Sequence, residues 1–181
     1  MKFLKQFSIL IISFYMALNY SYGQELEKDT LKTDESKNVI YGTVGFVPIY
    51  AVANISYERC IAANDNKFLR SFWLKVSGGL WEAWAVGGPH FFAGLTSLTG
   101  SGNHHLELNI GFVSMYDKKS YEDNYLYNPN GNSESLSKSD FIDNSIAGGV
   151  GYRYQPTDGG FVFRAGLSYP ESIYFSLGVS F

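Results

Sequence analysis

Residues 173–181 read IYFSLGVSF, and this stretch decides the fold class. Strict alternation of large apolar side chains with smaller or polar ones over nine residues is the pattern of a β-strand with one apolar face. The apolar positions are Ile173, Phe175, Leu177, Val179 and Phe181. Between them stand Tyr174, Ser176, Gly178 and Ser180.

The same alternation recurs upstream in short segments that are separated by Gly, Pro, Asn and Asp. With the terminal stretch we predict eight strands, the others lying near residues 40–47, 53–58, 72–80, 90–98, 106–112, 146–154 and 161–169. The polar face consists mainly of Gly, Ser, Asn and isolated charges, which suits a narrow interior better than a water-exposed surface. We therefore predict an all-β fold, a closed antiparallel up-and-down transmembrane β-barrel of about eight strands.

The first residues have the organisation of a secretory signal peptide. Lys2 and Lys5 precede a mostly apolar run at 7–18, and small residues at 21–23 resemble a cleavage site. An N-terminal membrane anchor is the alternative, but the run is shorter than the ~20 residues that a spanning helix needs. We predict a signal peptide at 1–23, a flexible periplasmic leader at 24–38 and the barrel at 39–181.

The expected connections differ in length between the two ends of the barrel. We predict short periplasmic turns at 63–67, 99–103 and 155–160, and longer outer connections at 81–89 and 116–140. Aromatic residues at the expected strand ends suggest interfacial girdles. These residues are Tyr41, Tyr50, Trp81, Trp84, Tyr116, Tyr152, Tyr154 and Tyr169.

Over residues 39–181 the chain resembles the small eight-stranded outer-membrane β-barrels, and its terminal strand ends on an aromatic residue as theirs do. The resemblance implies location in a Gram-negative outer membrane, contact with its lipid and recognition by the barrel assembly machinery. It also implies that Phe175, Leu177, Val179 and Phe181 form the assembly signal. It implies no particular activity, because fold and function are separable.

Charged residues of both signs fall on the expected inner face of five strands. They are Glu58, Lys75, Glu107, Arg153 and Arg164. Buried charges are tolerated when they are paired, so we expect a network that fills the lumen. An ion or proton path, or an acid and base pair, is the alternative interpretation.

The expected outer connection at 116–140 contains Tyr121, Tyr125 and Tyr127, followed by a stretch rich in Asn and Ser. Tyr combined with Asn, Ser and Gly is typical of adaptable recognition surfaces, which suggests contact with an extracellular partner. A solvated connector without a binding role is the alternative.

Other function classes receive little support from the sequence. A net charge of −3 gives no electrostatic footprint for nucleic acid. The adjacent His104 and His105 point to opposite faces of a strand and make a poor joint metal site, and we expect no cofactor.

We therefore predict a non-enzymatic barrel with a structural or surface-interaction role. A lipid-modifying barrel enzyme, which would need groups such as His90, Ser114 and Glu82 within hydrogen-bond reach, is an alternative. A soluble exported ligand-binding barrel is another.

Overall fold

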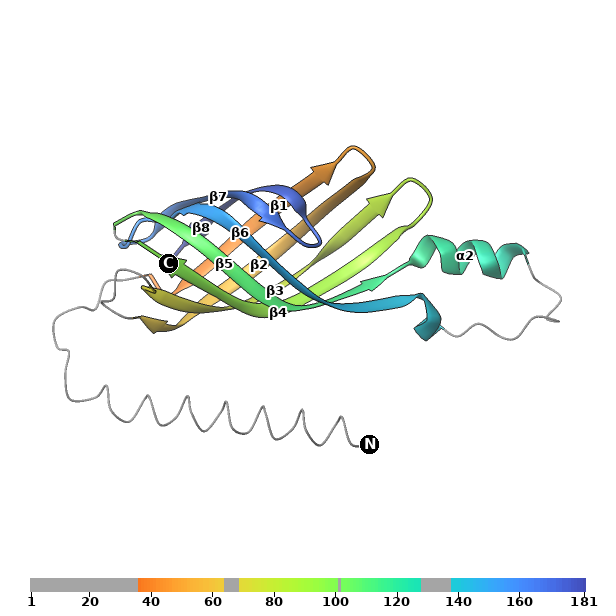
Figure 1. The fold of residues 1–181 in the computed structure, drawn as a ribbon, viewed down its shortest axis with the longest axis horizontal. Coiled ribbons are helices and arrows are strands. Elements are labelled where there is room, and N and C mark those ends of the chain that lie inside the picture. Colours follow the sequence, from red (N-terminus) through yellow and green to blue (C-terminus); the bar gives the residue numbers. More distant parts are fainter. Residues whose placement is uncertain (1–35, 64–68, 101, 128–137) are drawn as a thin grey trace, which may run out of the picture. The chain divides into compact units, whose positions relative to one another are not determined.

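The computed structural model describes residues 36–63, 69–100, 102–127 and 138–181. The predicted signal peptide and residues 24–35 of the predicted leader lie outside the described residues. The described residues contain eight strands and two short helices (Figure 1). The strands are β1 (Asn38–Val47), β2 (Tyr50–Ala63), β3 (Ser71–Ala83), β4 (Gly87–Thr99), β5 (His104–Tyr116), β6 (Ile142–Tyr154), β7 (Gly160–Ser168) and β8 (Ser172–Ser180). The helices are α2 (Lys118–Tyr127) and the 3₁₀ helix η2 (Lys138–Phe141), both between β5 and β6.

Each strand pairs antiparallel with its neighbour in sequence, and β1 also pairs with β8, which closes the barrel. The closing register runs from Val39 opposite Ser180 to Phe46 opposite Ile173. Two backbone hydrogen bonds of 2.9 Å between Asn38 and Phe181 complete this seam. The predicted fold class, a closed eight-stranded antiparallel barrel, is confirmed.

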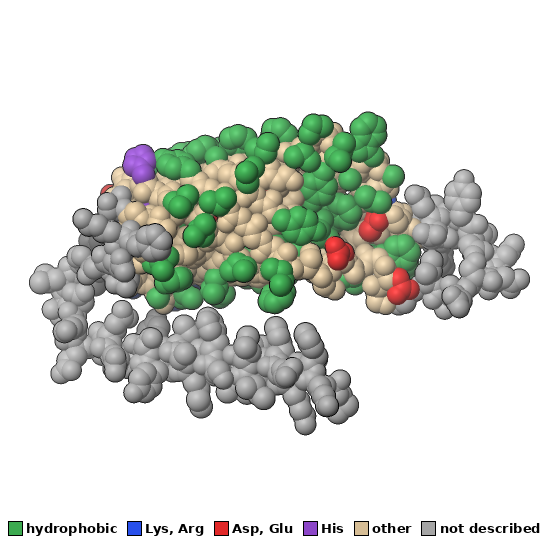
Figure 2. Space-filling view, viewed as in Figure 1, with side chains coloured by type: hydrophobic (Ala, Val, Ile, Leu, Met, Phe, Trp, Pro, Cys, Tyr) green, Lys and Arg blue, Asp and Glu red, His purple; other side chains and the backbone are tan. Residues whose placement is uncertain are grey.

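The wall of the barrel is apolar outside and polar inside. In β8, Phe175, Leu177 and Val179 are exposed, whereas Tyr174 and Ser176 point inward and are buried. Apolar side chains accordingly cover much of the outer face that is visible in Figure 2. The alternation read from the sequence therefore assigns the strand residues to the correct faces.

The two ends of the barrel differ. At the terminal end, where β1 begins and β8 ends, β6 and β7 are joined by a tight turn in which the Gly159 amide donates to the Pro156 carbonyl. Gly159 has φ +88°, a conformation that glycine adopts without strain, and the short turn predicted at 155–160 is confirmed. The opposite end, which carries α2 and η2, is called the loop end below.

Two connections at the loop end differ from the sequence-based expectation. The predicted long connection at 81–89 is wrong: β3 and β4 form a tight hairpin, in which Ala83 and Val86 exchange two backbone hydrogen bonds. The adjacent glycines, which suggested a loop, pair with β3 instead, Gly88 standing opposite Trp81. Residues 116–140 are not only a loop, because they contain α2 and η2.

The predicted aromatic girdle is wrong for three residues. Tyr41 is buried inside the barrel, and Tyr50 and Trp81 lie on the inward positions of β2 and β3 near the loop end. Inward residues alternate with outward ones, so position near a strand end does not by itself place an aromatic ring in the outer wall. Trp84, by contrast, is 85% exposed at the tip of the β3–β4 hairpin.

The wall is uneven at the loop end because the β7–β8 hairpin is short. β6 pairs with β5 along its whole length, from Ile142 to Tyr154. Its pairing with β7 covers only Gly149 to Tyr154. The first seven residues of β6 therefore extend past the end of β7.

Candidate functional site

Four of the five predicted lumen charges meet inside the barrel. Glu58 comes from β2, Glu107 from β5, Arg153 from β6 and Arg164 from β7, and none is more than 1% exposed. Each occupies an inward position of its strand, which explains why alternation alone located them. Two carboxylates and two guanidinium groups leave the cluster, called the lumen network below, electrically balanced.

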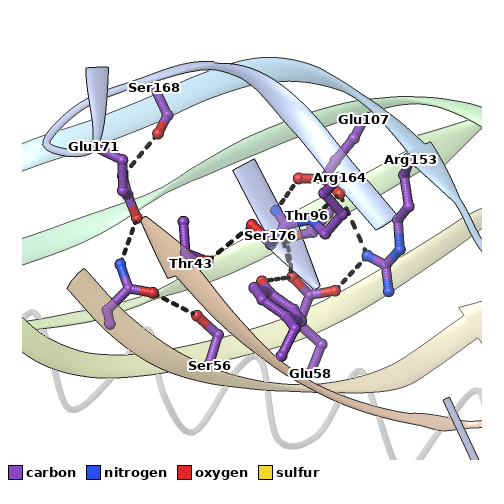
Figure 3. Close-up of polar contacts among 12 residues, drawn as sticks. Thr43, Ser56, Glu58, Thr96, Glu107, Arg153, Arg164, Ser168, Glu171 and Ser176 are labelled. Atoms are coloured by element: carbon purple, nitrogen blue, oxygen red, sulfur yellow. Dashed lines mark hydrogen bonds and ion pairs between the residues drawn. The ribbon is translucent and has the colours of Figure 1, made fainter. Parts of the chain in front are cut away.

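Direct ion pairs hold the lumen network together (Figure 3). Arg164 donates through Nε to Glu107 Oε2 at 2.7 Å and through its NH2 group to Glu107 Oε1, which makes the pair bidentate. Arg153 donates to Glu58 Oε2 at 2.5 Å and lies 3.4 Å from Glu107 Oε2. Glu58 also accepts hydrogen bonds from Tyr41 at 2.5 Å and from Thr96 at 3.3 Å. These contacts replace the hydrogen bonds to water that the Glu58 and Glu107 carboxylates lose on burial.

Aromatic rings complete the surroundings of the arginines. The Arg164 Cζ atom lies 4.1 Å from the centroid of the Tyr41 ring, and the Arg153 Cζ atom lies 5.1 Å from that of Trp73. Stacking of this kind stabilises a desolvated guanidinium group. Neither Tyr41 nor Trp73 was predicted as a site residue, although both stand on inward positions that the alternation of β1 and β3 identifies.

The fifth predicted residue, Lys75, is buried in the lumen but has different contacts. Its Nζ atom lies 5.0 Å from the centroid of the Phe92 ring and 5.8 Å from that of Tyr41. Among the described residues no ion pair joins Lys75 to the carboxylates of the lumen network. Lys75 therefore shares the lumen with the network without a direct ion pair to its carboxylates, and its membership of the network stays a prediction.

A second polar cluster, which the sequence analysis also missed, lies around Glu171. This residue belongs to the β7–β8 turn, yet it is 5% exposed. Its carboxylate accepts hydrogen bonds from Asn54 at 3.1 Å and from Ser168 at 2.7 Å (Figure 3). A glutamate in a tight turn normally faces water. The sequence therefore gives no indication that the β7–β8 turn places the Glu171 side chain inside the barrel.

These two clusters fill the barrel interior with side chains. The six largest fully buried residues of the described part are Arg153, Arg164, Tyr41, Tyr174, Glu58 and Glu107. An eight-stranded barrel has an interior just wide enough for such side chains. The arrangement favours a filled lumen over an ion path.

The residues considered for catalysis or metal binding are not brought together. His90 is buried in the lumen, whereas Ser114 stands opposite the exposed Phe91 and so belongs to the outer face of the wall. Glu82 is exposed and pairs with Lys119. His104 is exposed and His105 buried, on opposite faces as expected.

The three predicted contact tyrosines belong to helix α2. The Tyr121 ring packs edge-on against Phe141, with ring centroids 5.5 Å apart, so it holds the helix against η2. Tyr125 and Tyr127 belong to the same helix, and their side chains lie outside the described part of the structure. A salt bridge of 2.5 Å between Lys119 and Glu82 also ties α2 to the rim.

Asp117 immediately precedes helix α2 and bonds to its first turn. Its carboxylate accepts backbone hydrogen bonds from Ser120 at 3.1 Å and from Gly87 at 3.2 Å. Burial opposes ionisation, but these bonds outweigh it and hold the pKa of Asp117 below its ordinary value. An aspartate before a Lys118–Glu122 pair four residues apart is a helix-start signal that the sequence analysis overlooked.

Comparisons with known proteins identify no family for this chain. No protein-family model matches the chain, and no curated protein matches it significantly. Among solved structures it is similar to the crystal structure of Ail, the attachment invasion locus protein of Yersinia pestis. The two share 13% sequence identity with a TM-score of 0.38, and the match covers 83% of this chain and 97% of that one.

Proposed function

We propose that this chain is a barrel of a Gram-negative outer membrane, with a side-chain-filled lumen and a structural or surface-interaction role. The observation that carries the proposal is the inverted distribution of polarity. The ion-paired Arg153 and Glu107 are fully buried inside, whereas Ile110 and Ile146 are 62% and 70% exposed on the wall. In lipid such a wall is stable, because every backbone group of a closed barrel is paired internally.

The same distribution argues against a soluble exported ligand-binding barrel. Soluble barrels place apolar side chains inside and polar ones toward water. Here the outer wall carries apolar residues on every strand, far more than an isolated exposed patch on a water-soluble protein. An enzyme receives no support from His90, Ser114 and Glu82, because they lie on different faces of the wall.

Within this proposal, helix α2, which carries Tyr121, Tyr125 and Tyr127, meets an extracellular partner. It is tied to the rim at its first turns by Asp117 and Lys119, which present it in a fixed place at the loop end. Preorganisation of this kind lowers the entropy cost of binding. The barrel assembly machinery is the second proposed partner, and it would read the strand that ends at Phe181.

Fractionation of cells that express the full chain tests the location. We expect the protein in the outer-membrane fraction, resistant to extraction by carbonate, and a periplasmic soluble protein would overturn the proposal. Protease added to whole cells should cut within residues 116–140. Cleavage that occurs only after the cells are opened would show that the orientation is reversed.

A further inference from the structure

A pocket of about 580 Å³ opens at the loop end of the barrel, where β7 stops short of β6. Three aromatic residues line it: Tyr50 of β2, Trp81 of β3, and Tyr169, which follows β7. The Tyr50 and Trp81 rings lie side by side, with centroids 6.1 Å apart and planes inclined by 34°. Tyr50 and Trp81 occupy inward positions of their strands, and their rings therefore form an aromatic side of the pocket.

The same pocket, called the mouth pocket below, is also acidic. Asp117, Asp140 and Asp143 line it, and no Lys, Arg or His is among its lining residues. Acidic side chains also gather toward the loop end in the view of Figure 2. Within the described ranges, no three acidic, histidine or cysteine side chains are placed to share one metal ion. Spaced carboxylates beside aromatic faces suit a larger cation with apolar substituents better than a bare metal ion.

Unpartnered polar atoms mark the inner part of the mouth pocket. Tyr50 Oη and Trp81 Nε1 are buried and have no hydrogen-bond partner. His90, the β4 partner of the lining residue Met115, is 4% exposed and has neither ring nitrogen bonded, but it is not itself a lining residue of the pocket. Tyr50 Oη can accept a hydrogen bond from an ammonium or guanidinium group, whereas Trp81 Nε1 only donates and requires an acceptor such as water.

We propose that the mouth pocket binds an organic cation, either a free ammonium compound or the Lys or Arg side chain of a protein partner. Aromatic faces attract such a charge through their quadrupole, and the carboxylates supply the matching negative field. The pocket is distinct from the α2 surface proposed above, and binding by the purified protein does not depend on where the protein resides.

The test uses the full mature chain refolded in a maltoside detergent, because phosphocholine detergents carry a competing quaternary ammonium group. Isothermal titration compares tetramethylammonium, N-acetylarginine amide and its neutral citrulline counterpart. We expect saturable one-to-one binding of the two cations and none of citrulline. The tighter of the two cations then identifies the source, a free ammonium compound or an arginine side chain.

Variants locate the site. Trp81→Leu is expected to weaken cation binding about fivefold or more, and Trp81→Phe much less, because it keeps an aromatic face. Asp143→Asn, at an exposed position that should not disturb folding, is expected to weaken it about threefold. Asp158→Asn at the terminal end and Trp84→Leu at the hairpin tip are the matched controls. Equal binding of citrulline, equal competition by K⁺, or unchanged binding in both pocket variants would overturn the proposal.

Discussion

Replacement of Glu107 by Gln tests how the lumen network stabilises the barrel. The change keeps the size of the side chain and removes its charge. Arg153 and Arg164 are direct cross-strand partners on β6 and β7, so two like charges face each other inside the wall. Like charges in such positions repel, and Glu107 contacts both of them. The variant leaves Glu58 as the sole carboxylate of the network.

Glu107→Gln is expected to lower the free energy of unfolding by a large amount for a single substitution. Removal of one partner of a buried ion pair typically costs about 3–5 kcal/mol, because it leaves a charge without compensation. Glu58 remains 2.5 Å from Arg153, so we expect the lower end, a loss of about 3 kcal/mol in the free energy of unfolding. The reason is Arg164, which loses its bidentate bonds to the Glu107 carboxylate and keeps only a 4.0 Å ion pair with Glu58.

Urea unfolding in detergent micelles, followed by tryptophan fluorescence, measures this loss. Glu82→Gln is the matched control, because it makes the same chemical change at the exposed pair with Lys119, and it should leave the midpoint nearly unchanged. Adding Arg164→Met to Glu107→Gln removes the stranded cation and should restore part of the stability. A loss under about 1 kcal/mol in Glu107→Gln would refute the view that the network is essential to stability.

Three further predictions follow from the closing seam and the loop end. Deletion of Phe181 should lower the amount of assembled protein in cells far more than stability after refolding, and normal surface levels would contradict this. Gly178→Ala should destabilise the seam by about 1–3 kcal/mol, because the added Cβ would clash with the Ile40 carbonyl oxygen, whereas Gly42→Ala has open space and should behave as wild type. Asp117→Ala should loosen α2 by about 1 kcal/mol, seen as faster proteolysis at neutral pH. The lowered pKa of Asp117 means that wild type loses this contribution only in acid, as pH falls below about 4, so the two proteins should then be cut at similar rates.

Alternation predicted the barrel and its two faces because it is a local consequence of backbone geometry. Successive side chains of a strand point to opposite sides whatever the partner strand, so Glu107 and Arg153 were assigned to the lumen correctly. Which of these charges pair with each other depends on the register between neighbouring strands, and the sequence of a single strand does not determine that register. Lys75 shows this limit, because it shares the lumen with the network but contacts the Phe92 and Tyr41 rings.

The loop end was less predictable because its structure depends on contacts between hairpins of unequal length. Glu171 looks like a turn residue in the sequence and reaches the lumen only because the β7–β8 hairpin folds inward toward Asn54. Trp81 and Tyr50 look like interfacial aromatics and become pocket walls only because they occupy inward positions. A repeated local pattern in the sequence is enough to predict a closed barrel. The structure of its loop end depends in addition on the residue at which each strand ends. The mouth pocket therefore had no signal in any single segment, and its proposed cation specificity rests on residues that β2, β3, η2, β6 and the segments after β5 and β7 contribute separately.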